Sequence, residues 1–382
     1  MNFLLRHIHL ILEEYEGTPP LAIYLKNYFR ANRTLGSRDR KAISQAVYTY
    51  YRFAKRFPEG STPFEIITCG LRYSNADHSF LKTMILKEFP EIESDLHDIA
   101  VYPLPEAPPL SEGISEDDWH NHFLTQPDMF IRTRYEGVEE RLRDKNIPFS
   151  IIPLEENRQG KCIKIPGQTD VSSLLPADSY VVQDWASQKS IGILLTNLSS
   201  QKTQTVWDCC AGAGGKSLML KDNLPQAEIL ATDIRNSILR NLIARAKQYH
   251  LNIPSTHVLD LTDRRQIQES IGSKKFDLIL CDVPCSGSGT WARTPEQFYF
   301  FKRRSLKKWT EKQLTISSNV VPYLQDDGIF AYITCSVFRE ENEAVVKSLT
   351  KRYPLEIIHK QLINGILVGS DSMFIALLKW KS

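Results

Sequence analysis

The chain has 382 residues, of which 42% are hydrophobic and 24% are charged. These fractions are typical of a globular protein, and the length provides for two or three domains. No apolar run approaches the roughly 20 residues that a membrane helix needs, so we expect no membrane contact. The formal net charge of only +2 excludes a polybasic coat, so any nucleic acid must be bound by local patches.

The first residues, MNFLLRHIHLILEEYEG, form an apolar stretch that is interrupted by Arg6, His7 and His9. Since it lacks a cleavage site of small residues, we expect a helix rather than a signal peptide, and a cytoplasmic location. The seven cysteines are an odd number in such a chain, which disfavours a disulfide framework. No Cys-x-x-Cys pair or Cys/His cluster indicates a metal site. Five cysteines lie between residues 209 and 335.

Residues 1 to about 95 show the apolar spacing of amphipathic helices. One such helix is predicted over Ser37–Arg56, with Ser37 as its N-cap. Its inward stripe is expected to be Ile43, Ala46, Val47 and Tyr50. The proline-rich segment Tyr102–Pro109 cannot sustain a helix or an interior strand, so we interpret it as a linker. The predicted helical domain with its linker covers residues 1–105.

After the linker, residues 120–168 are predicted to form a small α/β subdomain. Its strands are expected at Phe130–Arg134 and Phe149–Pro153, with a helix at Val138–Lys145 between them. Residues 169–382 alternate strands with helices, which is typical of a Rossmann-like, doubly wound parallel α/β sheet. The strands of this sheet are expected at Val206–Trp207, Ile229–Ala231, His257–Leu259, Phe276–Cys281 and Ile329–Thr334. Helices are expected after Gly215, Asn236, Arg264 and about Ser305.

A glycine-rich loop, Asp208-Cys-Cys-Ala-Gly-Ala-Gly-Gly-Lys216, connects the first of these strands to a helix. Glycines at such a turn let the backbone approach a ligand closely, and the helix start offers unpaired N–H groups. A Walker loop would require glycine where Cys210 stands, which disfavours ATP and GTP. The Gly-x-Gly-x-x-Gly pattern is absent, which disfavours NAD.

Four parallel strands each end near an aspartate: Asp208, Asp233, Asp260 and Asp282. Doubly wound sheets bind ligands at this edge, although any single aspartate can instead cap a turn. Asp233 is expected to bind ribose hydroxyls, and Asp260 to reach an adenine amino group. The pattern therefore predicts S-adenosyl-L-methionine as cofactor and no metal. The expected cofactor-binding residues are Cys210, Ala211, Gly212, Ala213, Gly214, Gly215, Lys216, Asp233, Asp260 and Asp282.

Two cysteines lie just past strand ends in polar turns rich in glycine and serine. They are Cys285, in Asp282-Val-Pro-Cys-Ser-Gly-Ser-Gly289, and Cys335, in Thr334-Cys-Ser336. Both are expected at the tops of neighbouring strands beside the cofactor. A buried cysteine is otherwise a small hydrophobe, which is the interpretation that we favour for Cys69, Cys162, Cys209 and Cys281. Position alone leaves open which of the two cysteines attacks.

These motifs resemble the Sun/Fmu (RsmB/NOP) family of S-adenosylmethionine-dependent RNA 5-methylcytosine methyltransferases. The resemblance also rests on Gln183-Asp-Trp-Ala-Ser-Gln188, Tyr332-Ile-Thr-Cys-Ser336 and Met373-Phe-Ile-Ala376. It implies a class I methyltransferase fold, with residues 1–105 similar to the family's NusB-like RNA-binding domain. The chain departs from the family by Gly-Ala-Gly-Gly-Lys in place of Ala-Pro-Gly-Gly-Lys, and by Ala292 and Thr294 in place of a basic residue and an asparagine that affect RNA contacts.

The resemblance assigns the catalytic roles. Cys335 is the implied nucleophile, whose thiolate adds to carbon 6 of cytosine and makes carbon 5 nucleophilic. Cys285 is implied in the release of the product. Asp282 is expected to hydrogen-bond the cytosine edge or the cofactor. Lys216 is either a second electrostatic contributor or a solvated lysine at a helix start.

The implied substrate is RNA, with ribosomal RNA preferred, transfer RNA as the alternative, and a monomer as the expected state. The target base must be flipped or unpaired. The aromatic run Phe298–Phe301 and the cations after it, from Lys302 to Trp309, suit RNA contact, or else form the core face of a helix. Further cations that could extend the RNA track are Arg33, Arg38, Arg40, Lys41, Arg132 and Arg134.

Two rival functions remain open. A class I methyltransferase acting on an exocyclic amine or a protein commonly has an Asn/Asp-Pro-Pro-Tyr/Phe motif where this chain has Asp282-Val-Pro-Cys285, and it would leave Cys335 unexplained. A non-catalytic ribosome-assembly factor with the same fold would be expected to lose the thiols, and both are present.

Overall fold

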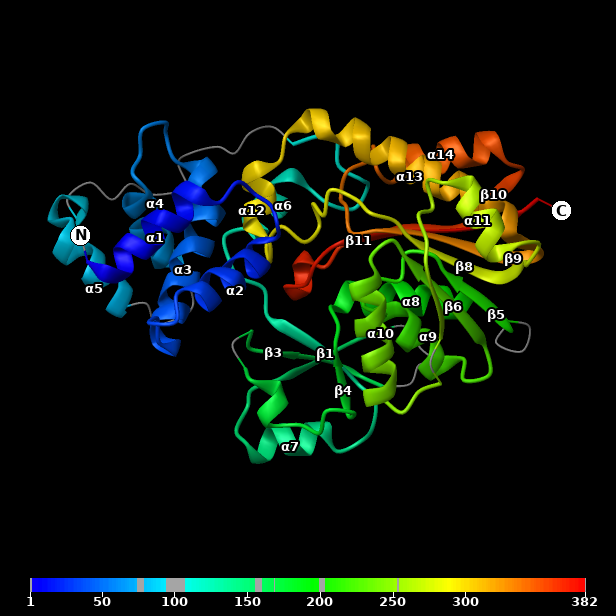
Figure 1. Ribbon diagram of the computed structural model, residues 1–382, viewed down its shortest axis with the longest axis horizontal. Helices are drawn as coiled ribbons and strands as arrows, with labels where there is room; N and C mark the ends of the chain where they lie inside the picture. Colours follow the sequence, from blue (N-terminus) through cyan, green and yellow to red (C-terminus); the bar gives the residue numbers. More distant parts are fainter. Residues whose placement is uncertain are drawn as a thin grey trace. The chain divides into compact units, whose positions relative to one another are not determined.

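The computed structural model describes residues 2–73, 79–93, 107–154, 160–167, 169–198, 203–252 and 254–381. They form two compact units, which the chain enters more than once (Figure 1). The helical unit comprises the described residues of Met1–Pro108, Ser115–Gln126 and Thr290–Arg303. The sheet unit comprises those of Pro109–Ile114, Pro127–Gly289 and Arg304–Ser382. Most of the predicted linker, residues 102–106, lies outside the described residues.

The helical unit buries the apolar faces that the spacing predicts. Its helices are α1 (Phe3–Glu14), α2 (Leu21–Ala31), α3 (Ser37–Phe53), α4 (Pro63–Gly70), α5 (Ser79–Glu88), α6 (Glu116–His122) and α12 (Pro295–Phe300). Ile43, Ala46 and Val47 of α3 are fully buried, as expected. Ser37 is not the N-cap that we predicted. Gly36 takes that position, because its backbone N–H donates to Asp39 Oδ2 at 3.0 Å and the helix then begins at Ser37.

Residues 290–303 belong to the helical unit although they follow the Cys285 loop in sequence. Buried Arg52 of α3 donates to the carbonyl oxygens of Ala292 at 2.8 Å and Phe123 at 2.6 Å. Phe298 is buried, and the ring of Tyr299 lies 5.2 Å from that of Tyr51. These aromatic side chains therefore pack in the core, the alternative to stacking on bases. Among the cations after them, Arg303, Arg304, Lys307 and Lys308 are exposed.

The sheet unit is built on a seven-stranded sheet of order β10-β11-β9-β8-β5-β6-β7. Its strands are β5 (Thr205–Asp208), β6 (Glu228–Asp233), β7 (Ser255–Val258), β8 (Phe276–Asp282), β9 (Leu324–Thr334), β10 (Leu355–Ile363) and β11 (Met373–Trp380). Strands β9, β8, β5, β6 and β7 are parallel, and β11 and β10 add antiparallel pairs at one side. All five predicted strands are present, which confirms the α/β doubly wound class.

Helices cover both faces of this sheet, with α13 and α14 on one face and α8 and α9 on the other (Figure 1). The helices of the unit are α7 (Val138–Asp144), α8 (Trp185–Asn197), α9 (Gly215–Asn223), α10 (Asn236–Gln248), α11 (Arg264–Ile271), α13 (Leu306–Val320) and α14 (Glu343–Arg352). Strands β5, β6, β8, β9 and β11 contribute residues to one buried apolar cluster between the layers, as expected for a sheet covered on both faces. In the described part of the chain, no helix has the length and hydropathy of a membrane span.

A small antiparallel sheet of order β2-β3-β1-β4 precedes the large one. Its strands are β1 (Met129–Thr133), β2 (Ser150–Ile152), β3 (Cys162–Ile165) and β4 (Tyr180–Val182). Arg132 of β1 is only 1% exposed and pairs with Asp222 of α9 at 2.7 Å, and Arg134 pairs with the same carboxylate at 2.9 Å. Both arginines are thus buried ion-pair partners, so our suggestion that they extend an RNA track is wrong.

Replacing Arg132 with alanine should lower the free energy of unfolding by about 2 kcal/mol, because the buried Asp222 keeps only Arg134 as an ion-pair partner and the deleted side chain leaves a cavity. Urea unfolding followed by circular dichroism measures the change. Arg141→Ala, on the exposed face of α7, is the matched control and should change stability by less than about 0.5 kcal/mol. An Arg132→Ala protein of full stability but reduced RNA affinity would restore the RNA-contact interpretation.

Candidate functional site

Two backbone N–H groups of the glycine-rich loop donate hydrogen bonds to strand β6. The N–H of Ala211 donates to the carbonyl of Thr232 at 2.9 Å, and the N–H of Gly212 donates to Asp233 Oδ2 at 3.1 Å. Gly214 is the N-cap of α9 with φ +81°. A Cβ there would also lie 2.6 Å from Leu242 Cγ, so both backbone conformation and space require glycine. The loop is therefore held open at the carboxyl edge of the sheet.

Asp233 lies at the end of β6 beside this loop, as predicted, and is largely buried. Arg235 binds both of its carboxylate oxygens, at 2.9 and 3.1 Å. Burial raises the pKa of Asp233, but the hydrogen bonds from Arg235 outweigh it and leave that pKa below its usual value. Asp260 lies two residues past β7 and accepts hydrogen bonds from Thr262, at 2.9 Å from N and 2.7 Å from Oγ1. Its predicted role toward adenine stays a prediction.

Asp208, the last residue of β5, lies beneath the loop and is 1% exposed. Its Oδ2 accepts a short hydrogen bond from the Ser217 hydroxyl in the first turn of α9. Burial raises the pKa of Asp208 to about 7, although the bond from Ser217 opposes that shift. The floor of the loop thus holds a carboxyl group that titrates near neutral pH.

Lys216 and Asp282 form an ion pair at the centre of the site. Lys216 Nζ lies 2.6 Å from Asp282 Oδ2, and the side chains are 12% and 28% exposed. Burial lowers the pKa of Lys216, but the Asp282 carboxylate and a thiolate at Cys335 raise it, and the net shift is upward. Lys216 is therefore a partly buried cation between the two groups, which favours the electrostatic interpretation over a solvated lysine.

The two cysteines meet because their strands are parallel neighbours. Strands β8 and β9 pair Asp282 with Ile333, so the turns that follow both strands begin at the same level. Cys285 Sγ and Cys335 Sγ lie 3.1 Å apart, and both thiols are free. The contact with Cys335 and burial both raise the pKa of Cys285 well above its usual value. A thiol at Cys285 can thus donate toward a thiolate at Cys335.

A glycine lets these two turns touch. The N–H of Gly289 donates to the carbonyl of Cys335 at 2.9 Å, and the N–H of Ser372 donates to the carbonyl of Gly289 at 2.9 Å. A Cβ on Gly289 would lie 2.0 Å from the Ser372 carbonyl oxygen, so any side chain would separate the turns. The sequence motif that ends in Gly289 is therefore needed for close backbone approach.

The structure brings Lys216, Asp282, Cys285 and Cys335 together, with the glycine loop and Asp233 at the same edge of the sheet. Sequence analysis missed Glu341, which is fully buried and accepts hydrogen bonds from the residues that follow both cysteines. The signal was the polar run Glu340-Glu-Asn-Glu343, which begins five residues after Cys335 in a segment that folds against the sheet.

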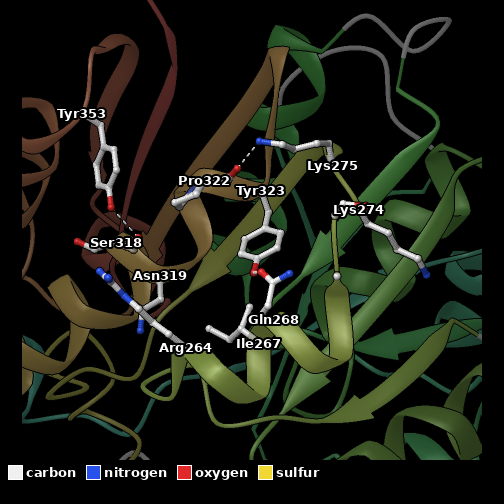
Figure 2. Close-up of a pocket in the computed structure, with 12 residues that line it drawn as sticks. Arg264, Ile267, Gln268, Lys274, Lys275, Ser318, Asn319, Pro322, Tyr323 and Tyr353 are labelled. Carbon is white, nitrogen blue, oxygen red and sulfur yellow. Dashed lines mark hydrogen bonds between the residues drawn. The ribbon is translucent and has the colours of Figure 1, made fainter.

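A separate hollow of about 520 Å³ lies away from this chemistry (Figure 2). Its lining includes Lys274 and Lys275, just before β8, and Pro322 and Tyr323, just before β9. It therefore opens at the amino ends of the two strands, opposite the edge that carries the cysteines. Lys275 Nζ is already engaged by the carbonyl of Pro322, and Arg264 Nε donates to Asn319 at 2.7 Å. None of the residues that line this hollow is among the predicted site residues.

Comparison with known proteins finds a match for the carboxyl-terminal half of the chain. Residues 195–376 match the model of a family described as 16S rRNA methyltransferase RsmB/F. The match covers slightly less than half of the chain. The match agrees with the family that the motifs resemble and with S-adenosylmethionine as the predicted cofactor.

Among curated relatives, ribosomal RNA small subunit methyltransferase B of Yersinia pseudotuberculosis is 30% identical over 173 residues, which cover 45% of this chain and 38% of that protein. The protein of the same name from Yersinia pestis matches equally. The chain thus spans about two fifths of the length of these relatives.

Solved structures confirm the fold. The crystal structure of PH0851 superposes with a TM-score of 0.66 at 19% identity and covers 93% of both chains. A methyltransferase homologue from Pyrococcus horikoshii gives a TM-score of 0.57 at 18% identity, over 69% of this chain and 90% of that one. At these identities the likeness establishes the class I methyltransferase fold.

The raised pKa of Asp208 predicts a specific pH dependence of stability. The folded chain keeps this proton up to about pH 7, whereas an unfolded chain loses it near its usual value of 3.8. Between these values the folded state binds the extra proton, so the contribution of Asp208 to stability falls as the pH rises. Relative to Asp208→Asn, the wild-type free energy of unfolding should fall by roughly 1.4 kcal/mol per pH unit between pH 5 and 7.

Urea unfolding at pH 5, 6, 7 and 8 tests this difference. Asp326→Asn, an exposed residue of β9, serves as the control and should follow the wild-type profile. Parallel profiles for wild type and Asp208→Asn would show that Asp208 titrates normally.

Proposed function

We propose that this protein transfers a methyl group from S-adenosyl-L-methionine to carbon 5 of a cytosine in RNA, with Cys335 as nucleophile and Cys285 as its helper. The observation that carries the proposal is the pair of free thiols 3.1 Å apart at the ends of adjacent parallel strands, beside a charged pair and a glycine loop. The match of residues 195–376 to the model of an rRNA methyltransferase family supports it. An enzyme acting on an exocyclic amine needs no such pair of thiols.

The loop fits the cofactor. A Cβ on Gly212 or Gly215 would meet no atom within 4 Å, so the loop backbone faces open space. The buried Asp208 Oδ1 has no hydrogen-bond partner among the described residues, which leaves an acceptor beneath the loop. In this proposal residues 210–216 hold the amino-acid part of the cofactor, Asp233 the ribose hydroxyls and Asp260 the adenine. When bound, the cofactor supplies an electrophilic methyl group.

The side chains around the cysteines suit covalent catalysis at the cytosine ring. The Cys335 thiolate forms a bond to carbon 6, and the electron pair displaced from the ring double bond makes carbon 5 nucleophilic. The Lys216 ammonium stabilises negative charge beside Cys335, and the Asp282 carboxylate accepts a hydrogen bond from the cytosine amino edge. After methylation the proton on carbon 5 leaves to water, its electron pair restores the ring double bond, and the bond from carbon 6 to Cys335 Sγ breaks, which regenerates the Cys335 thiolate. Cys285, in contact with Cys335, assists this release.

For the substrate we propose ribosomal RNA, since the matching relatives are named ribosomal RNA small subunit methyltransferases, with transfer RNA as the alternative. The helical unit offers a basic surface of its own. A hollow of about 410 Å³ is lined by Lys26, Arg30, Arg33 and Arg40 around Phe29. Cations that pair with phosphates around a ring that can stack on a base suit single-stranded RNA.

The roles of the two cysteines predict opposite outcomes when each is removed. Cys285→Ala should accumulate a covalent protein–RNA adduct that survives denaturing electrophoresis, because release is blocked after Cys335 has attacked. Cys335→Ala should form no adduct and should lose at least about 10⁴-fold in kcat, as expected when a nucleophile is removed. The assay uses methyl-labelled cofactor and total bacterial RNA, with 5-methylcytosine as product.

Two results would contradict these assignments. Label found only in protein or as an N-methylated base would reject the reaction. An adduct that forms in Cys335→Ala but not in Cys285→Ala would exchange the two roles.

Binding of the cofactor should depend on Asp233. Asp233→Ala is expected to weaken S-adenosyl-L-methionine binding by roughly 10- to 100-fold, the value of one lost charge-assisted hydrogen bond. Isothermal titration calorimetry measures the dissociation constant. Glu228→Ala, an exposed residue at the opposite end of the same strand, is the control and should bind as the wild type does. Equal affinities for both variants would remove Asp233 from the cofactor site.

A further inference from the structure

A carboxylate that the proposed mechanism does not use lies directly behind the two cysteines. Glu341 is fully buried, and four hydrogen bonds reach its side chain. The donors are the N–H and hydroxyl of Ser286, the hydroxyl of Ser336 and the amide of Gln313, all of them uncharged. Burying a carboxylate costs free energy unless its oxygens accept hydrogen bonds. The four bonds to Glu341 offset this cost, and the groups that donate them indicate what the carboxylate does.

The donors reveal what Glu341 connects. Ser286 follows Cys285, and Ser336 follows Cys335. Glu341 Oε1 accepts from the Ser286 N–H at 2.8 Å, and Oε2 accepts from the hydroxyl of Ser336 at 2.5 Å. One rigid carboxylate therefore bridges the turn after β8 and the turn after β9, each one residue beyond its cysteine.

Neighbouring groups fix Glu341 itself. The Tyr332 hydroxyl donates to its backbone carbonyl at 2.6 Å. Gln313 of α13 donates to Glu341 Oε1 at 2.9 Å and also to the carbonyl of Pro284 at 3.0 Å, on the other side of Cys285. Ser288 and Ser336 share a further hydrogen bond of 3.0 Å between their hydroxyl oxygens. The two turns are thus joined by side chains as well as by the Gly289 backbone bond.

The charges around the sulfurs are asymmetric. The Glu341 carboxylate adds to the increase in the pKa of Cys285, after the contact with Cys335 and burial. Lys216, in contrast, is a cation whose pKa is raised by negative charge on Cys335. The buried hydroxyl of Tyr332, which has a raised pKa, also faces Cys285. The arrangement favours a protonated Cys285.

We propose that Glu341 is a positioning residue, whose carboxylate holds the Cys285 and Cys335 turns together so that the two sulfurs stay in contact. The geometric part of this inference stands on the structure alone, while its catalytic consequence rests on the proposed function. The experiments separate the two.

The geometric part is tested with phenylarsine oxide, which condenses with two adjacent thiols to form two As–S bonds and releases one water. The quantity measured is the phenylarsine oxide binding of the wild type that is lost in Cys285→Ala, because only that part requires the Cys285 thiol. Glu341→Ala should weaken this binding at least about tenfold, because sulfurs that are no longer held together act at a lower effective concentration. Glu341→Gln should stay within about threefold of wild type, since its amide oxygen still accepts two N–H groups and its NH₂ can donate to both serine hydroxyls.

Glu340→Ala, at the preceding half-buried position, is the matched control and should bind as the wild type does. Thermal unfolding accompanies each variant, and Glu341→Gln keeps the test valid if Glu341→Ala does not fold. Wild-type arsenical affinity in folded Glu341→Ala would overturn the proposal. Equally weak binding by Glu341→Gln and Glu341→Ala would overturn it as well.

The catalytic consequence is measured in the methyl-transfer assay. Glu341→Ala should lose about 10²-fold in kcat, the effect of misplacing a reacting group by about 1 Å, with KM for the cofactor unchanged. Glu341→Gln should recover most of that loss. If the wild type transfers no methyl group to RNA, the proposed function fails while the arsenical result still decides the role of Glu341. A rise in KM with unchanged kcat would place Glu341 in cofactor binding and reject positioning.

Discussion

Parallel pairing of β8 with β9 determines the chemistry available at the site. Because Asp282 and Ile333 are register partners, the turns that carry Cys285 and Cys335 start level and converge. The sulfur contact, the Gly289 backbone bond and the Glu341 bridge all depend on this register. A shift of one residue along either strand would turn one cysteine to the opposite face of the sheet. The apolar side chains of both strands are buried, and this burial is what prevents such a shift.

The aspartates at the site differ in how deeply they are buried and in whether a cation compensates their charge. Asp208, under the loop, has its pKa raised to about 7 by burial, whereas Asp282, nearer the opening, is compensated by Lys216. Asp233 is also largely buried but has Arg235 as a partner. Three aspartates at equivalent strand ends thus have different environments. Only a partnered carboxylate can stay charged at low cost in a partly buried site, so the partners decide which aspartates can serve as anionic groups.

Much of the sheet and of its edge could be predicted from the sequence. Long apolar strands such as Phe276–Asp282 bury both faces, and the carboxyl ends of parallel strands must meet, which placed Cys285 and Cys335 together. The partners of individual side chains were harder to predict from the sequence. Arg132 resembles a surface cation in the sequence, but it pairs with Asp222 of a distant helix, and Phe298 resembles a stacking ring, but it packs against Phe123 and Trp291. Glu341 was missed because its partners are 55 residues upstream and 5 residues upstream, and only folding joins them.

Because residues 290–303 belong to the helical unit, recombination between related genes is restricted. The chain leaves the sheet unit directly after Gly289, completes the core of the other unit with Phe298 and Tyr299, and returns at Arg304. A recombination event that exchanged the amino-terminal segment alone would leave this insert without the apolar surface on which it packs. Recombination can therefore exchange the helical unit intact only if its three separate stretches of sequence are transferred together. The two units are thus expected to have evolved together within one gene.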